Sequence, residues 1–119
     1  MSIALVANPN YYNQAACGKV SIEKLAETIF PNFLERNVFL NNIELFQKAC
    51  DVTWYWYGEG VNGKTTLMHA LTHKYGYTRL PGDGEAEVYT YNGNTIKISN
   101  QKPNNAASEF VTYFSQTFS

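Results

Sequence analysis

The sequence lacks a charge excess of either sign. Nine Lys and Arg residues stand against ten Asp and Glu residues, so the formal net charge is −1. Proteins dedicated to nucleic-acid binding usually have a basic excess. The overall charge therefore gives no support to that class, and only a local basic groove is compatible with it.

Long apolar runs and clustered cysteines are also missing. No segment approaches the roughly 20 apolar residues of a membrane-spanning helix, and the first residues lack the basic start and apolar core of a signal peptide. Cys17 and Cys50 lie outside any CxxC or Cys/His pair. Dispersed thiols are typical of reduced proteins, in which each packs as a small apolar residue, although secretion would allow one disulfide. We expect an intracellular, cytoplasmic protein without membrane contact.

Apolar residues, by contrast, are plentiful. They make up 45% of the 119 residues, and 15% are aromatic, which predicts one compact domain. Residues 1–50 form a mainly helical half and residues 51–119 a half with a phosphate-loop motif and a hairpin.

The first half predicts one short strand and two helices. Residues 2–7 are apolar and partly β-branched, and residues 8–14 are rich in turn formers. Ser21 is a good N-cap for a helix that Pro31 ends, with an apolar face of Ile22, Leu25, Ala26, Ile29 and Phe30. A second helix is predicted from about Val38 to Ala49, with one side made of Phe39, Ile43, Phe46 and Cys50.

The second half predicts a strand, a glycine-rich loop, a helix and a hairpin. "VTWYWY" at residues 52–57 has no polar alternation, which is typical of a strand buried on both faces. Gly76 is placed to end the helix that follows the loop. Residues 76–87 predict a loop, residues 87–99 a hairpin turning at "NGN", and residues 108–118 a short helix or an edge strand.

The loop matches the pattern G-x-x-x-x-G-K-[ST] at Gly58, Gly63, Lys64 and Thr65. Glycines let successive N–H groups point at an anion, and the next helix adds its positive dipole end. Lys64 is expected to contact the β- and γ-phosphates of ATP, and the Thr65 hydroxyl to bind Mg²⁺. The predicted nucleotide-binding residues are Gly58, Gly60, Val61, Asn62, Gly63, Lys64, Thr65 and Thr66. The alternative is a tight β–α turn with a coincidental lysine.

With its surroundings, this loop resembles a known family. "YGEGVNGKTTLMHAL" is similar to the phosphate loop of superfamily 3 helicases, the replication ATPases of small viruses, plasmids and prophages. Asn62 before Gly63 is most like the primase-helicase type. The resemblance implies a second catalytic residue besides Lys64. In this family a polar Asn that follows an apolar strand senses the γ-phosphate, and Asn100 occupies a similar position after Ile98. A hairpin strand need not lie beside the loop strand, so the predicted hairpin competes with this role.

Two features of the family are absent. None of the acidic residues after the loop follows an apolar strand, where the family places its Mg²⁺-binding acid, and Arg79 is the only arginine after the loop. A missing acid or arginine lowers the rate of phosphoryl transfer by orders of magnitude. We therefore expect nucleotide binding with slow hydrolysis or none, unless a homo-oligomer supplies the missing groups.

Together these patterns predict an α/β single domain with a β–P-loop–α unit, two N-terminal helices and a C-terminal β-hairpin. The predicted function is an ATP-binding module related to viral or mobile-element replication ATPases. One alternative is a virus- or phage-encoded interaction protein that inhibits a host defence or replication complex and whose loop is vestigial; its low charge and many aromatics suit an interface. The other is a small nucleic-acid-binding domain, because tyrosines are able to stack on bases. His69 and His73 are interpreted as surface residues rather than as metal ligands.

Overall fold

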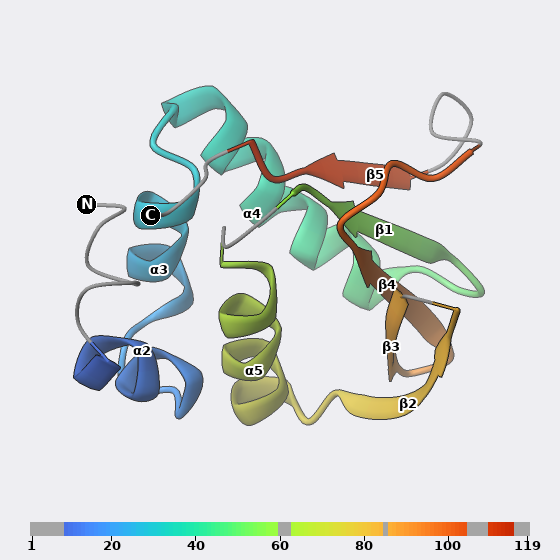
Figure 1. Cartoon of the computed structure of the whole chain (residues 1–119), viewed down its shortest axis with the longest axis horizontal. Coiled ribbons are helices and arrows are strands. Elements are labelled where there is room, and N and C mark those ends of the chain that lie inside the picture. Colours follow the sequence, from blue (N-terminus) through green and yellow to red (C-terminus); the bar gives the residue numbers. More distant parts are fainter. Residues whose placement is uncertain (1–8, 60–62, 85, 105–109, 116–119) are drawn as a thin grey trace.

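A computed structural model describes residues 9–59, 63–84, 86–104 and 110–115 and shows an α/β domain, which confirms the predicted class (Figure 1). The helices are α2 (Pro9–Ala16), α3 (Ile22–Ile29), α4 (Phe33–Lys48) and α5 (Lys64–Tyr75). The strands are β1 (Thr53–Tyr57), β2 (Thr78–Asp83), β3 (Ala86–Tyr91), β4 (Asn94–Ser99) and β5 (Phe110–Tyr113). None of the helices in these ranges combines the length and the hydropathy that crossing a bilayer requires.

The five strands form one mixed sheet in the order β2-β3-β4-β1-β5. β1 runs parallel to both of its neighbours, whereas β2, β3 and β4 form an antiparallel meander. Because parallel strands end at the same edge, the carboxyl ends of β1, β4 and β5 meet where α5 begins. Ligands of α/β sheets bind at this kind of edge.

The two helices predicted in the first half are present, and capping side chains begin both. The Ser21 side chain accepts a hydrogen bond from Lys24 N (3.1 Å), and the Asn32 side chain accepts one from Glu35 N (3.0 Å). Phe39, Ile43 and Phe46 are buried, as predicted. α4 nevertheless begins at Phe33, five residues before the predicted start, because Asn32 caps it there.

Three predictions about this half are wrong or fall outside the described residues. Residues 9–16 form α2 where a loop was predicted; Pro9 is pre-organised for the first turn of a helix. Three helices, not two, therefore precede β1 in the described part of the chain. Both cysteines are exposed rather than packed, and Cys50 lies after the end of α4. The predicted strand at residues 2–7 lies outside the described residues.

The strands of the second half also correct the sequence analysis in part. The hairpin of β3 and β4 is confirmed, with positive φ at Asn92 (51°) and Gly93 (85°), as a two-residue type I′ turn requires. β2 pairs with β3 where only a loop was predicted, with an irregular register between Leu80 and Asp83. Of the two alternatives for the last element, the edge strand is correct and the helix is wrong.

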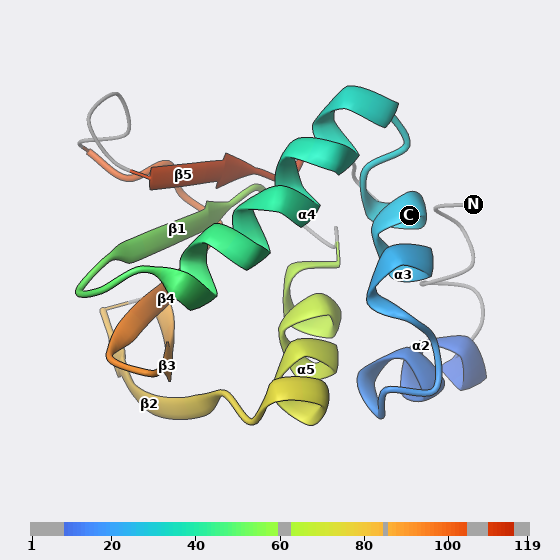
Figure 2. The same ribbon diagram turned by 180° about the vertical axis from the view of Figure 1, so that it is seen from behind.

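β1 places its two tryptophans and its two tyrosines on opposite faces. Trp54 and Trp56 are fully buried, and the ring centroid of Phe39 lies 5.4 Å and 5.5 Å from theirs. Tyr55 and Tyr57 are only half-buried, so the prediction of a strand buried on both faces is wrong for them. Figure 2 shows α4 running across one face of the sheet. The two tryptophans of β1 lie on this face.

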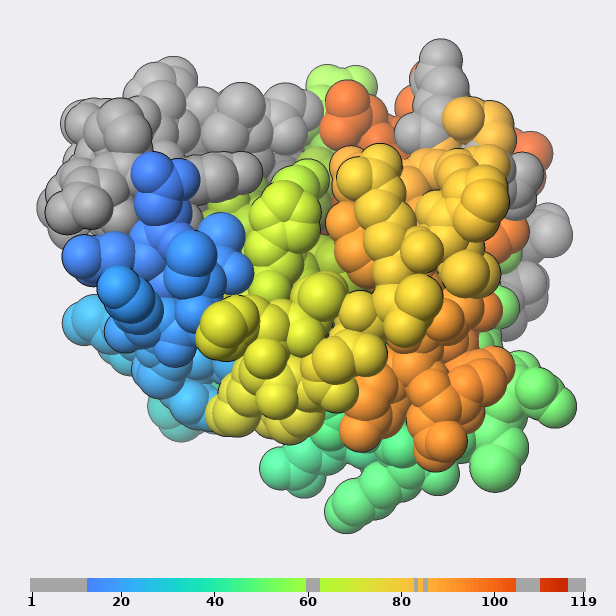
Figure 3. Space-filling model, turned by 90° about the horizontal axis from the view of Figure 1, so that it is seen from below, coloured from blue at the N-terminus to red at the C-terminus, as the bar shows by residue number. Residues whose placement is uncertain are grey.

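The remaining helices complete the core beside α4. Figure 3 shows α5 between α2 and α3 on one side and β2 and β3 on the other. α5 contributes Leu67, Met68 and Leu71 to the same cluster of buried side chains as Trp54 and Phe46. One core therefore joins the helical half to the sheet.

Candidate functional site

The connection between β1 and α5 is the site that the phosphate-loop motif predicts. β1 ends at Tyr57, Gly58 is buried, and α5 begins at Lys64. The strand before the loop and the helix after it are thus where the motif requires them. The amides of Gly60, Val61 and Asn62 lie outside the described residues.

Lys64 is buried, which is unusual for a charged side chain. It is 6% exposed, and its Nζ donates a hydrogen bond to the carbonyl oxygen of Gly58 at 2.6 Å. Burial lowers the pKa of the Lys64 ammonium below its usual value, and the Glu87 carboxylate partly opposes this effect. The ammonium therefore lies at the residue that follows β1, although Lys64 itself begins α5.

The N-terminus of α5 gives the site a second source of positive potential. Gly63 occupies the N-cap position with φ 90°, a conformation that favours glycine, and provides no side-chain acceptor for the first-turn amides. Thr65 in this turn is half-buried and Thr66 is buried. An anion here would meet the amides of the first helical turn and a positive dipole end.

Asn100 lies at the same edge of the sheet as the loop. β4 pairs in parallel with β1, with Ser99 opposite Tyr57, so Asn100 follows directly beyond the strand end. Asn100 and Gly58 both line a hollow of about 610 Å³. Its lining residues are Tyr57, Gly58, Glu59, Asn100, Gln101, Lys102, Tyr113, Phe114 and Ser115. The hairpin and the position beside β1 were treated as competing predictions, but β4 satisfies both.

Glu87 is the residue that the sequence analysis missed. It lies on β3 opposite Ile98 of β4 and is close enough to Lys64 to raise the pKa of the ammonium. In the sequence it precedes an apolar run instead of following one, so the family pattern does not indicate it. The order of the antiparallel meander, which places β3 next to β4, is the signal that would have found it.

The two histidines of α5 differ in their surroundings. His73 is exposed and lies against Gly18, where a Cβ would collide with its ring, and His69 is half-buried. Among the described residues, no group of three or more His, Cys, Asp or Glu side chains is placed to hold a metal ion.

Comparisons of the chain with protein-family models, with curated proteins and with solved structures find no match. The resemblance of residues 57–71 to a helicase phosphate loop is thus a likeness of one short motif. What supports a function is the placement of Lys64, Gly58 and the N-terminus of α5.

Proposed function

We propose that the chain binds the polyphosphate of a nucleotide, ATP together with Mg²⁺, where β1 leads into α5. The observation on which this depends is the buried Lys64 ammonium, 2.6 Å from the Gly58 carbonyl oxygen at the start of a helix. Burying an ammonium group is costly, and an apolar side chain of similar length would avoid that cost. A phosphate would be a further partner of this ammonium beside the Gly58 carbonyl oxygen, and its negative charge accounts for a cationic residue at the start of a helix.

The described residues also provide the oxygen atoms that magnesium prefers as ligands. Mg²⁺ in nucleotide sites usually takes one or two protein oxygens, and its remaining ligands are phosphates and water. Thr65 offers a hydroxyl in the first turn of α5, and Glu87 offers a carboxylate near Lys64. When bound, the ion would neutralise part of the phosphate charge.

Hydrolysis is proposed to be slow or absent in a single copy. Arg36 donates hydrogen bonds to the carbonyl oxygens of Phe30 (3.2 Å) and Pro31 (3.3 Å), so it serves the start of α4. Arg79 lies on β2, the strand farthest from β5 in the sheet. Neither arginine is thereby placed beside the hollow that contains Asn100, where a developing negative charge would need it.

Thermal unfolding with ATP tests this proposal. At a ligand concentration of 100 times the dissociation constant, binding adds about 2.7 kcal/mol to the free energy of unfolding. We expect ATP with Mg²⁺ to raise the melting temperature of the native chain. Lys64→Met should abolish that rise, and its own ligand-free melting temperature is the reference, because the variant also loses the hydrogen bond to the Gly58 carbonyl oxygen.

The matched control is Lys74→Met, which removes an exposed lysine near the other end of α5. It should keep the full response to ATP. An unchanged melting temperature for the native chain at millimolar ATP, or an equal rise in Lys64→Met, would contradict the proposal.

A second candidate function, binding of single-stranded nucleic acid, is favoured by the sheet face opposite the tryptophans. Tyr55 and Tyr57 are half-buried there, and the Nζ of Lys97 lies 6.0 Å from the Tyr55 ring centroid. A hollow of about 370 Å³ on this face is lined by Tyr55, Tyr57, Lys97, Gln101 and Lys102 among others. Aromatic rings with neighbouring lysines are the usual platform for single strands.

This second function predicts affinity that falls steeply as salt rises. Tyr55→Ala should weaken binding of a labelled oligonucleotide, whereas Tyr75→Ala, on α5, should not. A native chain that fails to shift the oligonucleotide at low salt does not have this function.

A further inference from the structure

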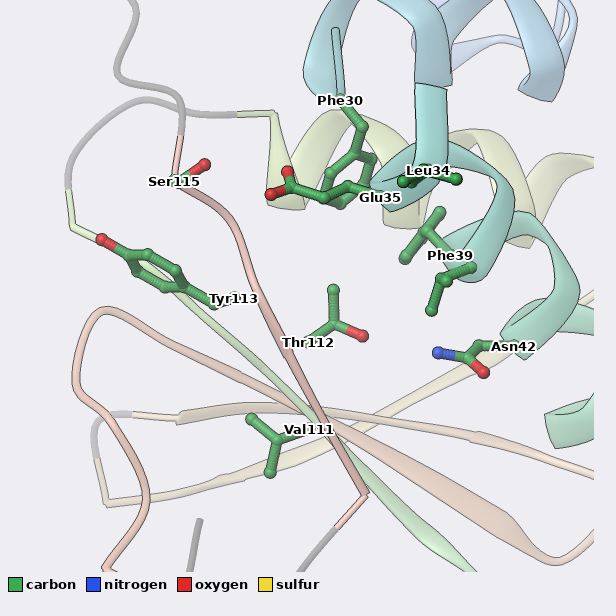
Figure 4. Close-up of a pocket in the computed structure, with 10 residues that line it drawn as sticks. Phe30, Leu34, Glu35, Phe39, Asn42, Val111, Thr112, Tyr113 and Ser115 are labelled. Carbon is green, nitrogen blue, oxygen red and sulfur yellow. The ribbon is translucent and has the colours of Figure 1, made fainter. Parts of the chain in front are cut away.

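One side of the molecule has two unpartnered features within the described residues. β5 ends the sheet, so its outer edge pairs with no described strand. A groove of about 500 Å³ lies between β5 and α4 (Figure 4). Its lining residues are Phe30, Leu34, Glu35, Val38, Phe39, Asn42, Val111, Thr112, Tyr113 and Ser115. We propose that two copies of the chain pair through this side, with β5 antiparallel to β5 of the second copy.

The two edges of the sheet differ in how they resist strand addition. β2, at the opposite edge, has a charged residue at Arg79, a proline at Pro81 and an irregular register. These are devices by which proteins protect an edge strand from pairing. β5 has the sequence "FVTY", with no charge, proline or bulge. Only the β5 edge is therefore chemically open to another strand.

The lack of charge on β5 favours an identical partner. Across a two-fold axis a surface meets a copy of itself, so charged residues near the axis would face their own kind. Phe110–Tyr113 contains none, and among the described residues that line the groove only Glu35 is charged. Glu35 lies on α4 and not on the pairing strand, so it does not oppose the contact of one β5 with the other.

The backbone of β5 fits a two-fold pairing in one register. Phe114 N donates to Tyr57 O at 2.8 Å, so alternate residues of β5 direct their backbone groups to β1 and those of Val111 and Tyr113 face outward. Pairing Val111 with Tyr113 of the second copy gives every outward N–H of the strand an acceptor. Thr112 then lies opposite Thr112 of the second copy. Figure 4 shows the Thr112 side chain pointing toward the groove and the Val111 and Tyr113 side chains pointing away.

The same rotation accounts for the apolar outer side of α4. Leu34 is 72% exposed and Val38 is 60% exposed, and both line the groove. A two-fold axis perpendicular to the sheet places both copies of α4 on the same face, one on each side of the axis. Leu34 and Val38 of one copy then face those of the other, so pairing removes exposed apolar surface from water.

The mass of the native chain in solution tests the pairing. Light scattering across a dilution series should give twice the chain mass at high concentration and the single-chain mass at low concentration. Val38→Lys should shift this transition to at least tenfold higher concentration, because it puts a charge in the groove. Leu45→Lys is the matched control, because Leu45 lies on the same helix, is 54% exposed and does not line the groove. A single-chain mass at every concentration, or equal effects of the two variants, would overturn the proposal.

A disulfide trap tests the register. In a chain with Cys17→Ser and Cys50→Ser, Thr112→Cys places two thiols opposite each other at a non-hydrogen-bonded pair, where the Cα atoms are about 4.5 Å apart and a disulfide fits. Mild oxidation should give a covalent dimer. Leu80→Cys, at an exposed position on the β2 edge, is the control, and this variant should remain largely monomeric. Equal yields from the two variants would rule out pairing at β5.

Discussion

The side chain of Asn94 joins three elements at one buried point. Its Oδ1 accepts a hydrogen bond from Val52 N (3.1 Å), and its Nδ2 donates to the carbonyl oxygens of Phe46 (3.0 Å) and Ala49 (2.9 Å). The residue is fully buried. It therefore ties backbone groups at the end of α4 and before β1 to the start of β4.

Asn94→Ala should destabilise the fold by at least about 2 kcal/mol, because it removes three hydrogen bonds made by one buried side chain. Chemical denaturation measures this loss. Asn104→Ala, in an exposed loop, is the control and should change stability by less than about 0.5 kcal/mol. A comparable loss in both variants would mean that the Asn94 hydrogen bonds contribute little.

Asn94 also shows why residue roles that depend on distant partners escape sequence analysis. "NGN" predicts a turn, and the turn is present, but two partners of Asn94 lie 45 and 48 positions away in the chain. Lys64 was predicted because the motif is contiguous. Glu87 was not, because only the sheet order brings β3 near the start of α5.

Tyr77 makes the stability of the fold decrease as the pH rises through the alkaline range. Burial raises the pKa of Tyr77 to about 12, although a hydrogen bond from Gln47 Nε2 (3.2 Å) opposes this rise. The unfolded chain loses this proton near pH 10, so the stabilising effect is complete below about pH 10 and is lost as the pH rises toward 12. Between about pH 9 and pH 11 we expect the free energy of unfolding to fall by about 1.4 kcal/mol through Tyr77.

Tyr77→Phe isolates this effect from other groups. The lowered pKa of Lys64 acts in the opposite direction. Its contribution to the free energy of unfolding increases with pH until the pH reaches the pKa of an ordinary lysine. The difference in unfolding free energy between Tyr77→Phe and the native chain should therefore become more favourable to the variant as pH rises. A difference that stays constant across this range would contradict the raised pKa.

At the scale of elements, α4 depends on the cap that sets its first residue. Asn32→Ala should destabilise the protein by about 1 kcal/mol, because Glu35 N loses its acceptor. Asn37→Ala makes the same chemical change at an exposed position inside the helix, where alanine has the higher helix propensity, and should be neutral or slightly stabilising. Only Asn32→Ala should lower the denaturant midpoint, and an equal lowering in both variants would exclude the cap as the cause.

Elements were predicted well where an apolar pattern continues and poorly where turn-forming residues interrupt one. α3 follows a helical apolar period, β1 and the β3–β4 hairpin are rich in β-branched and aromatic residues, and the loop motif and Gly76 bound α5. α2 begins at a proline and β2 contains Pro81 and Gly82, so both resemble loops. The predicted start of α4 is too far along the chain, because Phe33 and Leu34 are exposed and do not belong to the apolar face of the helix. The pairing of β4 with β1 joins residues far apart in sequence and has no local pattern.

At the scale of the whole molecule, the two halves share one aromatic core. Phe39 of α4 contacts Trp54 and Trp56 of β1, and its ring centroid is 5.8 Å from that of Phe114 beyond β5. Phe30 also contacts both Phe39 (4.7 Å) and Phe114 (5.0 Å). Neither half would retain a closed apolar core without the other.

We therefore expect the chain to unfold in a single cooperative transition. Tryptophan fluorescence reports on β1, and far-ultraviolet circular dichroism reports mainly on the helices, so the two curves should coincide. Phe39→Ala should shift both curves together, with a loss of about 3–5 kcal/mol, because it opens a cavity against both tryptophans. If helical signal persisted after the tryptophans became exposed, α2, α3 and α4 would form a unit that is stable without the sheet. The contacts of Phe39 argue against that outcome, because its buried ring lies against side chains of the sheet half.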